Sequence, residues 1–135
     1  MVNQQFAFAV HILAVLAYAG KVVDSRTVAA SVNTNPVVVR RLLLALRQAG
    51  LIDTATGKHG GAKLRKDPDR ISLLDIYDAV DPQPVIAVNR RNAFKNCPVS
   101  CSMSQIMGRV SKEADRAMRN HLHTITLGKL LRKIR

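Results

Sequence analysis

The chain has 135 residues, of which 47% are hydrophobic and 4% aromatic, enough for one ordinary domain or for a small domain with an appended helix. Its formal charge of +12 predicts an acidic partner, nucleic acid first, and the alternative is a solvated surface that is merely basic. The two cysteines exclude the disulfide framework of a small secreted protein.

An apolar run, FAFAVHILAVLAYAGK, opens the chain at residues 6–21. One helical stripe is formed by Phe6, Val10, Leu13 and Ala17, with Leu16 beside it. We therefore expect a buried first helix that ends at Gly20. The first ten residues contain no Lys or Arg, which argues against a signal peptide, and the run is too short to span a membrane. A cytoplasmic protein with no membrane contact is expected.

Two further helices are predicted next, separated by a tight turn. Ser25 can cap a short helix, RTVAASV. Thr34 or Asn35 can cap the longer one, in which Pro36 costs no hydrogen bond because it lies in the first turn. This longer helix runs through VVVRRLLLALRQAG and ends at Gly50. Its apolar face consists of Val39, Leu42, Leu43, Leu46 and Ala49.

A basic hairpin is predicted to follow. Two apolar segments, residues 51–52 and 62–64, flank a tip that contains Gly57, Gly60 and Gly61. This pattern is typical of two short strands joined by a loop. The bases of the tip and second strand are Lys58, His59, Lys63, Arg65 and Lys66, and no acid occurs among them.

The rest of the chain is predicted to contain a short helix, an irregular linker and a long helix. Ser72 caps the short helix, LLDIYDAV, and Asp75 is favourable near its N-terminus. The linker, residues 81–102, holds both cysteines. In the long helix, from Met103 to His123, Ile106, Val110, Ala114, Ala117 and Leu122 recur at helical spacing. Such a helix often pairs with a second copy, and folding back on its own domain is the alternative.

This order of elements is that of a winged helix-turn-helix, a mainly α fold with a small two-stranded β-wing and a long C-terminal dimerisation helix. We assign residues 1–81 to a DNA-binding domain, 82–102 to the linker, and 103–135 to the dimerisation helix and a basic tail. The second helix of the pair enters the major groove, and the hairpin reaches phosphates or the minor groove. The candidate DNA-binding residues are Ser25, Thr34, Asn35, Val37, Arg40, Arg41, Lys58, His59 and Lys63.

Several of these residues also have a purely structural interpretation. Ser25 and Thr34 can be helix caps and nothing else. Arg41 can pair with an acid on its own surface, and His59 can be ordinary turn material. His11, in the first helix, is expected to be a packed histidine rather than a ligand. Together these residues are stronger evidence for DNA binding than any one of them alone, because the bases occur on the two elements that are expected to contact DNA.

The segments SRTVAASVNTNPVVVRRLLLALRQAGLI and GKHGGAKLRKDPDRISLLDIYDAV resemble the Rrf-two (Rrf2) family of bacterial winged-helix regulators, and within it the YwnA-like branch. The resemblance covers most of residues 3–81. It implies a homodimeric transcription factor, usually a repressor, whose dimers pair through a long C-terminal helix. Ala62 departs from the pattern, since many members have an aromatic residue after the Gly pair.

The cysteines Cys97 and Cys101 leave three interpretations open. Cluster-binding members of the family carry three cysteines in this linker and a further ligand, and four ligands are usual for an iron–sulfur cluster or a structural zinc. With two thiols we expect no metal and no cofactor. A reversible thiol switch is favoured by Lys95 and by a helix start nearby, which promote thiol reactivity. We favour the third interpretation, two small packed residues.

The sequence also bears on two other classes of protein. An enzyme is not expected, because the sequence has no HExxH, no phosphate-binding glycine loop and no recognisable pair of nucleophile and base. A non-specific RNA- or ribosome-binding protein is compatible with the charge. The basic segments lack stacking aromatic residues, however, which favours double-stranded DNA over single strands.

Overall fold

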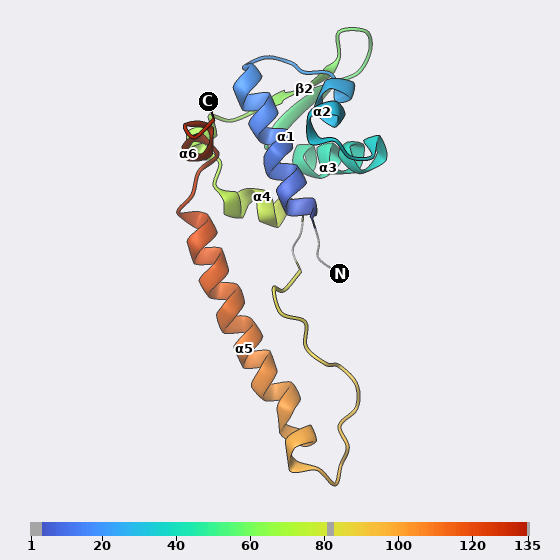
Figure 1. Cartoon of the computed structure of the whole chain (residues 1–135), viewed down its shortest axis with the longest axis vertical. Coiled ribbons are helices and arrows are strands. Elements are labelled where there is room, and N and C mark those ends of the chain that lie inside the picture. Colours follow the sequence, from blue (N-terminus) through green and yellow to red (C-terminus); the bar gives the residue numbers. More distant parts are fainter. Residues whose placement is uncertain (1–3, 81–82, 135) are drawn as a thin grey trace. The chain divides into compact units, whose positions relative to one another are not determined.

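The computed structural model of the chain describes residues 4–80 and 83–134 (Figure 1). Its elements are α1 (Gln5–Ala19), α2 (Ser25–Val32), α3 (Pro36–Gln48), β1 (Ile52–Ala55), β2 (Gly61–Leu64), the 3-10 turn η1 (Pro68–Arg70), α4 (Leu73–Val80), α5 (Pro98–His123) and α6 (Leu127–Leu131). The predicted fold class, mainly helical with a two-stranded wing and a long helix late in the chain, is confirmed. The chain forms two units: one holds the described residues before residue 81 and those from Leu122 onward, and the other runs from Gln83 to His121.

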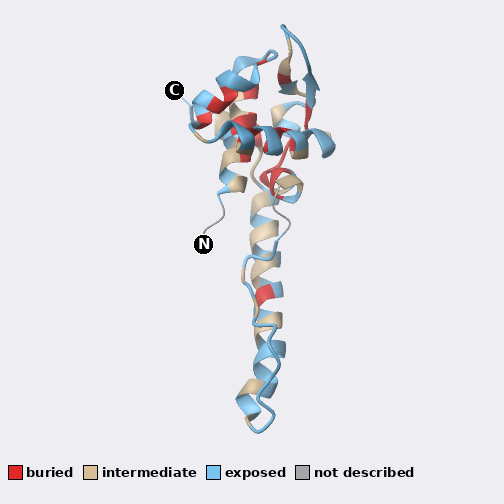
Figure 2. Cartoon of the chain, turned by 90° about the vertical axis from the view of Figure 1, so that its right-hand side faces the viewer, coloured by how far each residue is buried: buried red, intermediate tan, exposed pale blue. Residues whose placement is uncertain are grey.

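Helix α1 is the centre of the first unit, where most of the buried residues of the chain gather (Figure 2). It packs against α2, α3, β2, α4 and α6, and its buried residues are Ala9, Ile12, Leu13 and Leu16. The predicted stripe is only partly correct, since Phe6, Val10 and Ala17 are half-buried. Neighbours on several sides of α1 bury a wider and rotated face, which a single stripe does not describe.

The helices α2 and α3 form the predicted pair. Asn33 ends α2 with a left-handed φ of 58°, and the chain turns directly into α3. The buried residues of α3 are Val39, Leu42, Leu43 and Leu46, as predicted. Ala49 is exposed instead of buried, because the helix ends at Gln48 and Ala49 is already its C-cap.

The wing is an antiparallel pair of strands in which Ile52 lies opposite Leu64. A third segment joins it: the Val23 N–H donates to the Ala62 carbonyl at 2.8 Å, and the Ala62 N–H donates to the Val23 carbonyl at 2.9 Å. Gly61 has a φ of 153°, and a Cβ at this position would collide with the Val23 carbonyl oxygen. The glycine therefore lets β2 approach the segment that leads into α2.

Helix α4 begins with a reciprocal cap, as predicted for Ser72. The Asp75 N–H donates to Ser72 Oγ at 3.0 Å, and the Ser72 N–H donates to Asp75 Oδ2 at 3.0 Å. This arrangement satisfies two N–H groups that the first turn of a helix leaves without partners.

The C-terminal tail completes the core of the first unit, although the sequence predicted only a basic tail there. The Leu73 N–H donates to the Ile125 carbonyl and the Leu127 N–H donates to the Ile71 carbonyl, both at 2.8 Å. Leu127, the first residue of α6, is fully buried. The sequence did not predict this burial, because Leu127 lies among basic residues and is buried only through tertiary contacts.

In the second unit, α5 begins at Pro98 instead of Met103, so Cys101 lies inside the helix and the irregular linker is shorter than predicted. Ser111 is the buried residue of α5 in the described part of the chain, and its hydroxyl donates to the Ile86 carbonyl at 2.8 Å. The exposed large hydrophobic residues of α5 are Val99, Met103, Ile106 and Val110.

We predict that Gly61→Ala lowers the free energy of unfolding by about 2–3 kcal/mol, because the methyl group strains the backbone and pushes β2 away from Val23. Urea unfolding followed by circular dichroism measures the change. The matched control is Gly108→Ala in α5, where a Cβ meets no atom within 4 Å. That control should be neutral or stabilising by about 0.5–1 kcal/mol, since alanine favours helix. Equal losses for the two variants would contradict the steric explanation.

Candidate nucleic-acid interface

The N-termini of α2 and α3 carry caps that fix both helices. Asp24, not Ser25, caps α2: its Oδ1 accepts from the Thr27 N–H at 2.7 Å, and Ser25 is the exposed first residue of the helix. The expectation of Ser25 as cap was wrong because the extended backbone belongs to the residue before it. Of the two candidates for the next cap, Asn35 is the one used, and its Oδ1 accepts from the Val37 N–H at 2.9 Å.

The outward face of α3 is a stripe at helical spacing, opposite the buried face. Val37 and Leu44 are 50% and 51% exposed, and Arg40 and Arg41 between them are also exposed. Leu44 was missing from the predicted set, although its position one turn beyond Arg40 and Arg41 places it on the same stripe. The helix thus presents two guanidinium groups between two apolar side chains.

A hollow of about 540 Å³ separates α2 from the start of α3. Three predicted residues line it, namely Ser25, Thr34 and Arg40, together with Arg26, which the sequence reasoning did not single out. The sequence did give one indication for Arg26, because this base directly follows the start of the predicted helix. Cations and hydroxyl groups therefore meet at one concave place on the helix pair.

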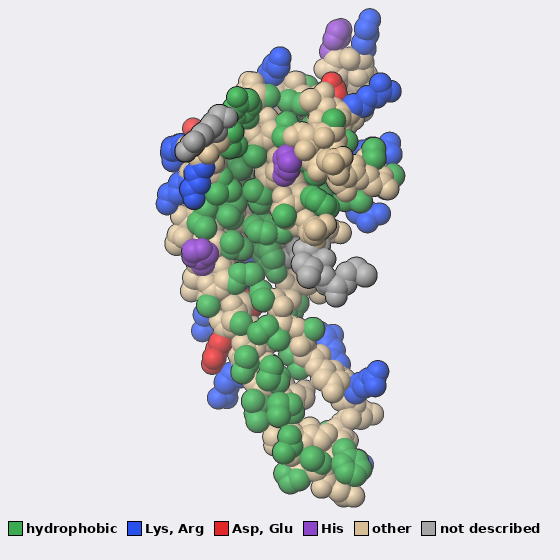
Figure 3. Space-filling view, in the orientation of Figure 1, with side chains coloured by type: hydrophobic (Ala, Val, Ile, Leu, Met, Phe, Trp, Pro, Cys, Tyr) green, Lys and Arg blue, Asp and Glu red, His purple; other side chains and the backbone are tan. Residues whose placement is uncertain are grey.

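A second hollow, of about 700 Å³, lies between the wing and the start of α2. Lys58 lines it from the hairpin, and Ser25 and Arg26 line it from α2, so both hollows share these two residues. The predicted residues His59 and Lys63 are exposed on the hairpin but line neither hollow. Figure 3 shows Lys and Arg side chains around the hairpin tip and on the side of α3.

The positive charge of this surface is not neutralised by nearby acids. Within the described residues, Arg40, Arg41, Lys58 and Lys63 form no salt bridge, whereas Arg65 lies 3.9 Å from Asp53. The acid closest to the helix pair is Asp24, whose pKa is lowered mainly by the hydrogen bond from the Thr27 backbone, with a smaller effect of Arg26. Its carboxylate therefore stays ionised as the N-cap of α2, and Asp24 also lines the second hollow.

The remaining candidates lie elsewhere. His11 was expected to be packed, but its side chain is exposed, and its Nε2 lies 3.0 Å from Ser31 Oγ. Cys97 is half-buried and Cys101 is exposed, and both are free thiols. The Ser100 N–H donates to Cys97 Sγ at 3.4 Å, and the Cys101 thiol lies 3.7 Å from the carbonyl oxygens of residues 94 and 95. The exposure of Cys101 does not match a packed residue.

Residues 4–80 and 83–134 contain neither a metal-binding cluster nor a membrane-spanning helix. In this part of the chain, no three His, Cys, Asp or Glu residues gather closely enough to hold a metal ion. No helix there has the length and apolar character needed to cross a membrane.

A family model and several similar proteins match the chain over almost its whole length. The Rrf2 family model, with the description iron-dependent transcriptional regulator, matches residues 2–133. YwnA of Bacillus subtilis (strain 168), an inferred HTH-type transcriptional regulator, is 38% identical over 94% of both chains. A crystal structure of an inferred DNA-binding protein is 34% identical with a TM-score of 0.73, covering 94% of this chain and 98% of that one. An inferred transcriptional regulator from Lactobacillus plantarum is 28% identical with a TM-score of 0.82, covering 96% and 88%.

The cap of α2 generates a prediction about acid stability. Because the folded pKa of Asp24 lies below its ordinary value of 3.8, its ionised form stabilises the fold above that pH, and this contribution is lost as the pH falls through the folded pKa. Asp24→Asn keeps a capping side chain without the titration. Near neutral pH the two proteins should unfold at similar urea concentrations. Below about pH 4 the wild type should lose stability more steeply than the variant, and parallel losses would contradict the assignment.

Proposed function

The chain belongs to the Rrf2 family of transcriptional regulators, and from this membership we propose that it regulates transcription as a DNA-binding homodimer in the cytoplasm. The observation that carries the proposal is the meeting of Arg26, Arg40 and Lys58 around two adjoining hollows of the helix pair and the wing. Positive groups on a convex helix and a protruding hairpin fit the grooves and phosphates of duplex DNA.

In this proposal α3 reads the major groove. Arg40 and Arg41 donate to base edges, and guanine O6 and N7 are the acceptors that a guanidinium matches best. Val37 and Leu44 offer apolar contact to thymine methyl groups. These four residues are exposed together on one face, which is the arrangement that a reading helix needs.

Phosphate contacts supply affinity and orientation. Ser25 and Arg26 begin α2, Thr34 precedes the Asn35 cap of α3, and helix N-termini attract phosphate oxygens. Lys58, His59 and Lys63 on the wing reach the backbone or the adjacent minor groove. In this division the first unit, with the C-terminal α6 in its core, contacts DNA, residues 83–97 form the linker, and α5 contributes the pairing helix.

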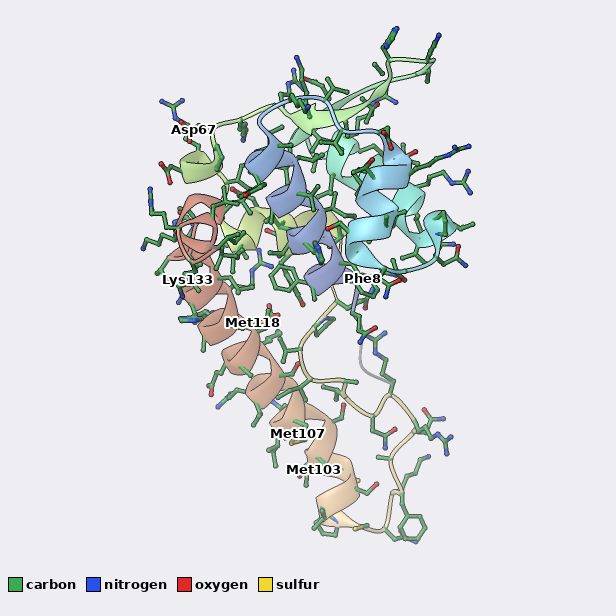
Figure 4. The ribbon with its side chains drawn as sticks, turned by 45° about the horizontal axis from the view of Figure 1, so that its top comes forward. Phe8, Asp67, Met103, Met107, Met118 and Lys133 are labelled. Carbon is green, nitrogen blue, oxygen red and sulfur yellow. The ribbon has the colours of Figure 1, made fainter. Side chains whose placement is uncertain are left out.

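Dimerisation is proposed to use the exposed apolar side of α5. Val99, Met103, Ile106 and Val110 are spaced by four, three and four residues, the repeat of a two-helix seam. Their exposed fractions run from 42% to 62%, which is high for side chains of this size. Figure 4 labels Met103 and Met107 along this helix. A two-fold dimer would present two α3 helices to a palindromic operator, where occupation represses transcription.

The donor set of one chain does not fit an iron–sulfur cluster. The family model carries the description iron-dependent, whereas the segment before and at the start of α5 offers two thiols, Cys97 and Cys101, and a cluster takes four ligands. The proposed function therefore involves no iron–sulfur cluster held by a single chain. A thiol-responsive regulator is the second candidate, favoured by the exposed Cys101 one helical turn from Cys97. Catalysis is no part of the proposal.

The proposal is tested with an electrophoretic mobility shift of the full chain. The probes are a duplex from the promoter of its own gene, a random duplex, and single-stranded RNA of equal length. The promoter duplex should bind most tightly at physiological salt, and its affinity should fall steeply with added salt as counterions are released. Equal affinity for both duplexes would overturn a specific regulator, and a preference for RNA would favour a non-specific nucleic-acid-binding protein.

Two substitutions separate base reading from phosphate contact. Arg40→Ala should cost about 1–3 kcal/mol on the promoter duplex and little on random DNA, because it removes a base contact. Lys58→Ala should weaken both duplexes alike and reduce the salt slope by about one. Titrations at several salt concentrations measure both effects. Indistinguishable effects of the two substitutions would count against the assignment of α3 as the reading helix.

The dimer is tested by Ile106→Glu, which buries a charge in the proposed seam. Sedimentation velocity should show a dimer for the wild type and a monomer for the variant, with unchanged helical circular dichroism. Promoter affinity should fall about tenfold or more, because two half-sites are no longer bound together. Lys112→Glu, also exposed on α5 but on another side, is the control and should remain dimeric. A monomeric wild type would refute the pairing.

A further inference from the structure

A cavity of about 630 Å³ lies beside α1 in the first unit. Its walls come from the second half of α1, the segment Lys21–Asp24, one side of α2 and Ile134 near the C-terminus. None of the residues that are proposed to contact DNA lines it. The volume falls in the range of sites for small molecules, which are concave and mostly apolar with a few polar groups.

The apolar part of the cavity is incompletely covered by the chain itself. Tyr18 is 75% exposed, Val22 41% and Ile134 47%, and all three side chains line the cavity together with Ala14 and Val15. Hydrophobic side chains are visible over α1 in Figure 3. Apolar surface gathered around a hollow gains free energy when an apolar ligand removes it from water.

Lys21 is the cation among the residues that line this cavity. Lys21 lines it, is exposed, and forms no salt bridge with any carboxylate in the described part of the chain. Asp24, the acid among the lining residues, stays ionised, and its carboxylate is held at the N-cap of α2 by the Thr27 N–H. Ser31 adds a hydroxyl, 3.0 Å from His11 Nε2. An anionic head group next to an apolar body therefore matches these walls.

We propose that this cavity binds a small amphipathic carboxylate, with its carboxylate at Lys21 and its apolar body against Ala14, Val15, Tyr18 and Val22. The occupant controls DNA binding. This second step rests on the proposed function.

The contacts of the cavity floor provide the coupling. Val23 lines the cavity and exchanges two backbone hydrogen bonds with Ala62 of the wing. Asp24, the next residue, lines the cavity and caps α2. A ligand that shifts the segment Lys21–Asp24 therefore acts directly on the wing and on the first helix of the DNA-reading pair.

Binding is tested without DNA, so that its outcome does not depend on the proposed function. Phenylacetate and octanoate are the anionic probes, and phenylacetamide is the neutral analogue of the first. Amide resonances of the ¹⁵N-labelled full chain should shift at Ala14, Val15, Val22 and Val23, and phenylacetate should bind about tenfold more tightly than phenylacetamide. No shift of these resonances with either carboxylate overturns the site. Equal affinity for acid and amide overturns the choice of an anionic ligand.

Two variants check the assignment of the walls. Lys21→Gln should weaken both carboxylates about tenfold and leave phenylacetamide unchanged. Ala14→Trp fills the cavity and should abolish binding of all three probes. Lys112→Gln, an exposed lysine of α5, is the control and should bind like the wild type. Thermal unfolding reports whether each variant folds. If Ala14→Trp does not fold, the result for Lys21→Gln alone decides whether the cavity walls are assigned correctly.

The regulatory step is tested by repeating the promoter mobility shift with saturating probe. A several-fold change in promoter affinity, absent in Lys21→Gln, supports control through the cavity. An unchanged affinity for the promoter, with the probe shown to be bound, overturns the control and leaves DNA binding intact. If the promoter duplex is not bound specifically at all, the proposed function fails and the regulatory step fails with it, while the resonance shifts still decide the binding site.

Discussion

Burial of one face of α1 is the interaction on which the rest of the first unit depends. Ile12, Leu13 and Leu16 are at most 1% exposed, and each contributes about 1.5–3 kcal/mol when it leaves water. Because α1 packs against α2, α3, β2, α4 and α6, these few side chains set the positions of the helix pair and the wing together. The elements that are proposed to contact DNA are therefore positioned by packing against α1, a helix that need not contact DNA itself.

The second constraint is electrostatic. The chain contains 21 Lys and Arg residues but only nine Asp and Glu residues, so most of the cations have no acid to pair with. In the first unit the described salt bridges, such as Arg132 to Asp69 at 2.9 Å, lie between exposed side chains and add little stability. Unpaired positive charge opposes folding slightly, but it lowers the free energy of association with a polyanion. The same imbalance thus makes the fold somewhat less stable and the proposed function possible.

Local patterns predicted the fold well wherever one residue decides the outcome. Gly20 ends α1 and Ser72 caps α4, as expected from the sequence, and Asn35, one of the two expected candidates, caps α3 before Pro36. Errors arose where a tertiary contact decides. Asp24 replaced its neighbour as the cap of α2, and Leu127 is buried only because two distant backbone segments meet.

The sequence also named some of the residues that line the two hollows. Basic residues on the longer helix and the hairpin were recognised from charge and spacing alone, and Ser25, Thr34 and Arg40 do line one hollow. Two residues of this surface were not predicted. Arg26 lines a hollow only because the start of α2 lies next to the wing in the fold. Leu44 is an exposed leucine in a helix whose other leucines are buried. Neither property is local in the sequence. The backbone pairing of Ile71 and Leu73 with residues 125–127 also makes residues 83–121 an insertion within one domain. In the proposed dimer, whole turns added to α5 within this insertion change the spacing of the two DNA-binding surfaces and leave the buried core of the first unit intact.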